Sequence, residues 1–107
     1  MNQVLSRLAA TIASRKGADP AKSWTAQLLA EGPEKAAEKF GEEAIEAIIE
    51  AVRGDRAKLT TEAADVIYHL LVMLQTRDVP ITDVLDELAR REHSSGIAEK
   101  AGRDHSE

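Results

Sequence analysis

The chain has 107 residues, a hydrophobic fraction of 43%, a formal net charge of −5 and no cysteine, which excludes disulfides and thiolate metal sites. A pI near 5.2 without a basic stripe argues against nucleic-acid binding. No apolar run approaches the roughly 20 residues that span a bilayer, and the first residues carry no signal-peptide pattern, so we expect a cytoplasmic protein that does not insert into a membrane.

The composition indicates an all-α fold. Helix-forming residues dominate, and aromatic residues make up only 3% of the chain, which leaves little strand propensity. The first helix is expected over residues 2–15, because Val4, Leu5, Leu8 and Ile12 recur at helical spacing on one face.

Small polar residues, proline and glycine set the remaining boundaries. Ser23 is expected to cap a short helix, Pro33 to begin a long one that ends at Gly54, and Thr60 or Thr61 to cap the next. The later helices are therefore expected at 24–30, 33–52 or 33–53, 62–76 and 82–92. We find no repeat or linker and expect one domain over 1–107, with a polar C-terminal tail at 93–107.

The long helix carries an unusual concentration of acid. Glu38, Glu42, Glu46 and Glu50 follow one another at a spacing of four residues, with Glu43 beside them. Like charges at this spacing cost roughly 0.2–0.5 kcal/mol per pair, so stability alone does not favour the pattern. At about 100° per residue these acids share one face of the helix. The face is either a solvated acidic surface or a cation site.

The next helix favours the cation site. Its segment 62–74 is apolar in nearly every direction, which is typical of a buried helix, and Glu62, Asp65 and His69 lie on one strip of it. A buried carboxylate is costly unless it is paired or binds a metal. Favourable siting in a first helical turn is the alternative for Glu62 and Asp65. For His69, the alternatives are a satisfied core residue and a group that orients a metal ligand.

Antiparallel packing of these two helices would bring their acids together. The expected metal-ligating set is Glu42, Glu43, Glu46, Glu62 and Asp65. Oxygen-only ligands select hard cations, so Mg²⁺ is expected, with Mn²⁺ as the alternative. A Mg²⁺ site of this kind commonly shares its remaining positions with substrate phosphates.

The spacing of these acids resembles a known signature. Glu42-Glu43-x-x-Glu46, followed after fifteen residues by Glu62-x-x-Asp65, is similar to the EExxE…ExxD motif of the all-α, MazG-like nucleotide pyrophosphohydrolases. Flanking segments narrow the resemblance to the phosphoribosyl-ATP pyrophosphatase family of histidine biosynthesis. These segments are 32–35, 39–43, 62–70, 90–92 and 95–100. The similarity covers nearly the whole chain.

The resemblance implies a helical bundle completed by homodimerisation and a Mg²⁺-dependent hydrolysis of phosphoribosyl-ATP to phosphoribosyl-AMP and pyrophosphate. Cleavage between the α- and β-phosphates needs an activated water and neutralisation of the leaving group, both of which a metal site can supply. Glu43 and Glu46 are the candidates for orienting or deprotonating that water.

Several cationic or flexible positions are candidate phosphate contacts. The substrate-binding candidates are Lys35, Lys39, Arg91, Gly96, Lys100 and Arg103. The alternative for the lysines is solubility and local pairing, such as Lys39 with Glu43, and for Gly96 the end of the last helix.

Two rival functions remain open at this point. One is a house-cleaning pyrophosphatase of the same superfamily that acts on dUTP or damaged nucleoside triphosphates. The other is a non-catalytic helical dimerisation module whose acidic face binds a partner. The segment after Glu92 favours the phosphoribosyl-ATP pyrophosphatase family over both rivals, because the superfamily motif alone does not require this segment.

Overall fold

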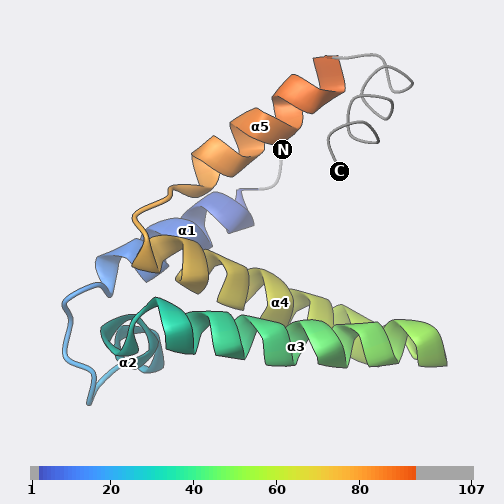
Figure 1. The fold of residues 1–107 in the computed structure, drawn as a ribbon, viewed down its shortest axis with the longest axis horizontal. Coiled ribbons are helices and arrows are strands. Elements are labelled where there is room, and N and C mark those ends of the chain that lie inside the picture. Colours follow the sequence, from blue (N-terminus) through green and yellow to red (C-terminus); the bar gives the residue numbers. More distant parts are fainter. Residues whose placement is uncertain (1–2, 94–107) are drawn as a thin grey trace.

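A computed structural model describes residues 3–93 of the chain, and in this part every regular element is a helix (Figure 1). The elements are α1 (Val4–Ser14), α2 (Trp24–Glu31), α3 (Pro33–Arg53), α4 (Arg56–Thr76) and α5 (Ile81–His93). The expected all-α fold is therefore confirmed. No described helix combines the length and the apolarity needed to cross a membrane.

Most of the predicted boundaries hold. The Ser23 side chain accepts a hydrogen bond of 3.1 Å from the amide of Ala26 and caps α2. Pro33 occupies the first turn of α3, and Gly54 ends that helix in the left-handed conformation, with φ of 81°. A side chain at that φ would be strained, so glycine is the natural terminator here.

The predicted start of α4 is wrong. The helix begins at Arg56, and Asp55 rather than a threonine caps it by accepting from the amide of Lys58 at 3.0 Å. Thr60 and Thr61 lie inside the helix, where their hydroxyls donate to carbonyls one turn earlier at 2.9 and 3.3 Å. Asp caps a helix at least as well as Thr, and threonine tolerates an interior position through this back-bonding.

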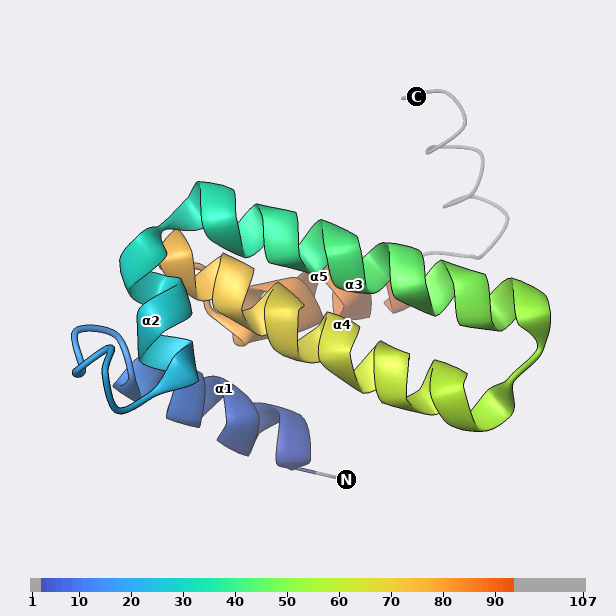
Figure 2. The ribbon, with the colours of Figure 1, turned by 90° about the horizontal axis from the view of Figure 1, so that it is seen from below.

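α3 and α4 form an antiparallel hairpin and pack along much of their length (Figures 1 and 2). α1 and α2 pack against α4, and α2 also packs against α3. The core where they meet consists of Ile12, Leu28, Ala36, Leu71 and Val72. Burying one large side chain such as Leu28 stabilises the fold by about 1.5–3 kcal/mol, so this small core anchors one end of the hairpin.

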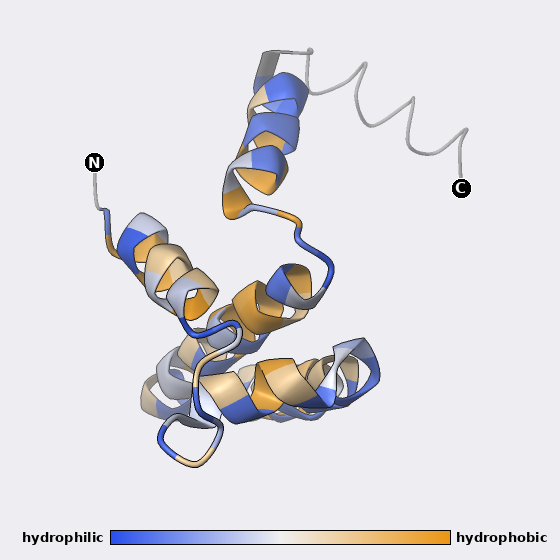
Figure 3. Cartoon of the chain, turned by 90° about the vertical axis from the view of Figure 1, so that its left-hand side faces the viewer, coloured by the Kyte–Doolittle hydropathy of each residue, from blue (hydrophilic) through white to orange (hydrophobic). Residues whose placement is uncertain are grey.

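Beyond this core the hairpin is covered incompletely by its own chain. Ile45, Ile48 and Ile49 on α3 are exposed, Val52 is 84% exposed, and Ile67 on α4 is 45% exposed. α5 extends away from the hairpin as a separate amphipathic helix with apolar and polar sides (Figure 3). The apolar residues of α4 that were expected to be buried on all sides are therefore buried only where α1, α2 and α3 reach them.

Candidate functional site

The α3–α4 hairpin brings three of the predicted carboxylates together. One ligand atom each from Glu43, Glu62 and Asp65 lies within 4.8 Å of the others, and all three side chains are partly buried. Glu43 comes from the middle of α3, and Glu62 and Asp65 share one face of α4 because they are separated by three residues. We call Glu43, Glu62 and Asp65 the carboxylate cluster.

With a helix start near residue 62, the favourable siting of acids in a first helical turn could explain Glu62 and Asp65. Because α4 begins at Arg56, Glu62 and Asp65 lie beyond its first turn. The favourable interaction of an acid with a helix N-terminus falls off within that first turn. The helix dipole therefore does not account for their placement.

Electrostatics within the hairpin indicate an unbalanced negative charge. A hydrogen bond with Glu46, followed by burial and the charges of Glu46, Glu43 and Asp65, raises the pKa of Glu62 to about 7. Burial raises the pKa of Glu43, and the charges of Glu46 and Asp65 add to this effect, while His69 lowers it. A cation at the cluster would relieve both desolvation and repulsion.

Two carboxylate oxygens at this end of the hairpin are buried without a hydrogen-bond partner in the described part of the chain. They are Oε2 of Glu62 and Oε1 of Glu50. Glu50 Oε1 has one ion-pair neighbour, the Nε of Arg53 at 3.8 Å. Buried polar atoms are normally satisfied, so an orphaned oxygen within an all-oxygen group fits a hard divalent cation such as Mg²⁺ or Mn²⁺.

Glu42 does not join the carboxylate cluster. Its side chain is half exposed, and it pairs with Lys39, whose Nζ lies 3.4 Å from Glu42 Oε1. Lys35 pairs in the same way with Glu38 at 3.5 Å. The local pairing expected as an alternative for these lysines is therefore present, although Lys39 pairs with Glu42 and not with Glu43.

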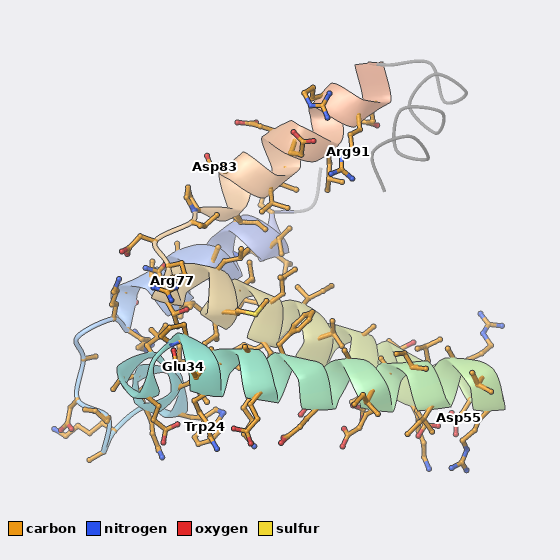
Figure 4. The ribbon with its side chains drawn as sticks, viewed as in Figure 1. Trp24, Glu34, Asp55, Arg77, Asp83 and Arg91 are labelled. Carbon is orange, nitrogen blue, oxygen red and sulfur yellow. The ribbon has the colours of Figure 1, made fainter. Side chains whose placement is uncertain are left out.

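Of the remaining predicted contacts, Arg91 alone belongs to the part of the chain that the structure describes. Arg91 belongs to α5, apart from the α3–α4 hairpin (Figure 4), and its Nε donates to Glu87 Oε2 at 3.1 Å. Hydrogen bonds from Arg90 and Arg91 lower the pKa of Glu87 to about 2. Gly96, Lys100 and Arg103 lie outside the residues that the structure describes.

A cavity of about 540 Å³ adjoins the cluster toward the α3–α4 loop. Its lining residues are Glu46, Ile49, Glu50, Ala57, Lys58, Thr61 and Glu62. The sequence pattern does not predict Glu50, Lys58 or Thr61 as site residues. Glu50 could have been found as the next position of the four-residue series after Glu46, whereas Lys58 was missed because α4 was expected to start later.

His69 lies one turn beyond Asp65 and is buried. Its Nδ1 is 2.8 Å from the backbone oxygen of Asp65, and its ring meets the edge of Tyr68 with centroids 4.9 Å apart. The Tyr68 hydroxyl shares a hydrogen bond of 2.5 Å with Oγ1 of Thr25 on α2. His69 is therefore both a core residue and a neighbour of the carboxylate cluster.

Comparisons with known proteins agree on one family. Residues 5–92 match the family model described as phosphoribosyl-ATP pyrophosphohydrolase. The phosphoribosyl-ATP pyrophosphatase of Cereibacter sphaeroides (strain ATCC 17025) is 75% identical over 100 residues, which cover 94% of this chain and 97% of the relative. The protein of the same name from Dinoroseobacter shibae is 76% identical, with coverage of 94% and 98%. That from Ruegeria pomeroyi is 73% identical, with coverage of 94% and 95%.

Proposed function

The chain belongs to the phosphoribosyl-ATP pyrophosphohydrolase family, and from that premise we propose that it hydrolyses phosphoribosyl-ATP to phosphoribosyl-AMP and pyrophosphate, a step of histidine biosynthesis. The observation that carries the proposal is the carboxylate cluster Glu43, Glu62 and Asp65. These residues belong to the two acidic motifs that the sequence shares with the all-α pyrophosphohydrolases, and they come from two different helices.

Glu43, Glu62 and Asp65 would hold Mg²⁺, with Mn²⁺ as the alternative, and Glu46 adjoins them through Glu62. A bound divalent ion neutralises charge on the phosphates and makes a nearby water more acidic. The all-oxygen donor set and the orphaned oxygen of Glu62 support this assignment. Glu42 remains a candidate ligand only if its pairing with Lys39 is released.

The reaction itself needs a proton acceptor close to the phosphates. Water attacks the α-phosphorus, the bond from that phosphorus to the bridging oxygen breaks, and pyrophosphate leaves with the bridging oxygen. A carboxylate takes the proton that the water loses. Glu46 fits this role best, because it lies against the cluster without being one of its three members, and Glu43 is the alternative.

Cations beside the site would bind the phosphates. Lys58 lines the adjoining cavity, and Lys35 and Lys39 lie on α3 before the acids. Recognition of the additional ribose 5-phosphate requires further donors, for which Arg91, Gly96, Lys100 and Arg103 remain the candidates. Guanidinium and ammonium groups suit a phosphate dianion that has no metal of its own.

A homodimer would complete the fold. Ile45, Ile48, Ile49 and Val52 form an exposed apolar face on α3, and Ile67 adds to the apolar surface on α4. Contiguous apolar surface of this kind usually marks an interface with another protein. A second copy, packed helix against helix across a two-fold axis, would cover it.

The test is a hydrolysis assay that offers phosphoribosyl-ATP beside ATP, dUTP and other nucleoside triphosphates, with Mg²⁺ present and in excess EDTA. We expect phosphoribosyl-ATP to give the highest kcat/KM, pyrophosphate to be the product, and EDTA to abolish turnover. Preference for dUTP or another triphosphate would favour the house-cleaning pyrophosphatase. No turnover of any nucleotide by the folded, Mg²⁺-loaded protein would favour the dimerisation module.

A further inference from the structure

His69 is the one buried polar side chain among residues 3–93, with 8% of its surface exposed. Its Nδ1 lies 2.8 Å from the backbone oxygen of Asp65. A carbonyl oxygen can only accept a hydrogen bond, so Nδ1 must carry a proton. In the neutral ring Nε2 is then the unprotonated nitrogen and presents a lone pair.

The surroundings hold this ring in place. The edge of Tyr68 packs against it at a centroid distance of 4.9 Å, and the hydroxyl of Tyr68 is itself tied to Thr25 of α2. Within residues 3–93, Nε2 has no hydrogen-bond partner. His69 follows Asp65 by one turn of α4 and is bonded to its backbone oxygen, so the ring borders the carboxylate cluster.

We propose that His69 Nε2 accepts a hydrogen bond from the water that attacks the α-phosphorus and thereby orients it. The chemistry of the groups expected around the site narrows the choice of hydrogen-bond partner for Nε2. Phosphate oxygens and ionised carboxylates are hydrogen-bond acceptors, and they cannot bond to a lone pair on Nε2. Water can, because it donates two hydrogen bonds.

A water held in this way would have a defined direction. When one of its protons is directed to His69 Nε2 and the other to a carboxylate of Glu43 or Glu46, its lone pairs are left for phosphorus. The carboxylate then takes the proton as the new oxygen–phosphorus bond forms and pyrophosphate leaves. His69 gains and loses no proton in this step. The inference rests on the proposed function and adds to it the residue that positions the nucleophile.

Two substitutions distinguish the role of Nδ1 from the role of Nε2. In His69→Asn the side-chain amide can replace the Nδ1 donor toward Asp65 but leaves the Nε2 position empty. In His69→Gln the longer side chain places an acceptor oxygen near the Nε2 position. If Nε2 orients the water, His69→Gln keeps kcat within about threefold, whereas His69→Asn lowers it about tenfold or more at unchanged KM. The increase in Tm on adding Mg²⁺ should be the same in both variants.

The opposite ranking, with His69→Asn active and His69→Gln impaired, would overturn the inference, because it would show that only the bond to Asp65 matters. Equal kcat in both variants would overturn it too. The wild-type protein gives a check that does not depend on folding of the variants: ¹⁵N NMR of its histidine rings, with His69 assigned by comparison with His69→Asn. We expect the Nδ1–H tautomer, and an Nε2–H tautomer would refute the inference.

These outcomes are distinct from failure of the proposed function. If the wild-type protein does not hydrolyse phosphoribosyl-ATP, the proposed function fails while the tautomer measurement still stands. If the wild-type protein is active and the two variants do not differ as expected, only the role of His69 fails.

Discussion

Glu46 on α3 lies against Glu62 on α4, and the hydrogen bond between their carboxyl groups contributes most to raising the pKa of Glu62 to about 7. Two carboxyl groups form such a bond only when one of them holds a proton. Below about pH 7 the metal-free protein therefore holds a proton at the place where the proposed function needs a cation. Cation binding should displace it, so proton release and metal binding are coupled.

The first prediction concerns pH and the stability of the metal-free protein. The pKa of Glu62 is about 7 in the folded chain and near 4.5 when unperturbed, so between these values the folded state binds more protons than the unfolded state. The free energy of unfolding should therefore fall as pH rises through this window. Glu43, whose pKa is also raised, acts in the same direction, whereas Glu87, with a pKa of about 2, acts only at lower pH.

This dependence can be measured by thermal unfolding in EDTA at several pH values. Glu62→Gln should make the fall in Tm between about pH 5 and about pH 8 clearly smaller, because the glutamine cannot ionise. Saturating Mg²⁺ should raise the wild-type Tm most at the high end of the range. A Tm that rises with pH in EDTA, and does so equally in Glu62→Gln, would contradict the prediction.

The second prediction concerns Glu46→Gln and Asp65→Asn. Each should lower kcat by about a hundredfold or more, because each removes a carboxylate needed for proton transfer or cation binding. Each should leave the metal-free protein as stable as the wild type or more stable, because a repelling charge is lost. Glu38→Gln is the matched control, since Glu38 lies on the exposed side of α3 and pairs with Lys35. If both site variants kept activity within twofold of wild type, the carboxylates would have no role in catalysis and the prediction would fail.

The third prediction concerns the apolar face of α3. Ile48 is 61% exposed in the single chain, and Ile48→Glu should convert the proposed dimer to a monomer or destabilise it, because a charge would be buried in the interface. Gln27→Glu on the exposed surface of α2 adds the same charge outside this face and should remain dimeric. Sedimentation velocity of both variants measures the outcome. A well-folded wild-type monomer at micromolar concentration would refute the dimer.

The fourth prediction concerns the residues after Glu92. Arg91 is engaged with Glu87, so the donors for the ribose 5-phosphate are expected to come mainly from Lys100 and Arg103. Removing residues 93–107 should raise KM for phosphoribosyl-ATP or abolish turnover, while helical content and the Mg²⁺-dependent rise in Tm persist. An unchanged kcat/KM after truncation would place recognition within the helices.

Much of the fold could be predicted because local chemistry fixes it. Ser23, Pro33 and Gly54 each have one conformational preference that the structure realises. The start of α4 is predicted too late because Asp55 competes with Thr60 and Thr61 as the N-cap. Asp55, directly after Gly54, is the stronger cap. Sequence spacing cannot rank such competitors when both lie in one short segment.

The arrangement of the candidate site could be predicted only in part, for a similar reason. Helical spacing alone placed Glu42 and Glu43 on the same broad face, but packing of α4 against α3 admits only Glu43 to the cluster and leaves Glu42 with Lys39. The cavity beside the cluster depends on how the two helices pack near their loop, which no periodicity encodes. Lys58 and Thr61 line this cavity because of that packing, so their positions cannot be predicted from spacing along the sequence.

The most direct test of the account is a crystal structure of the protein soaked with Mn²⁺, with anomalous differences measured near the manganese edge. We predict an anomalous peak between α3 and α4, at about 2.0–2.3 Å from carboxylate oxygens of Glu43, Glu62 and Asp65. The peak should disappear in Asp65→Asn crystals grown under the same conditions. An ordered structure with these three side chains in place and no peak among them would contradict the account.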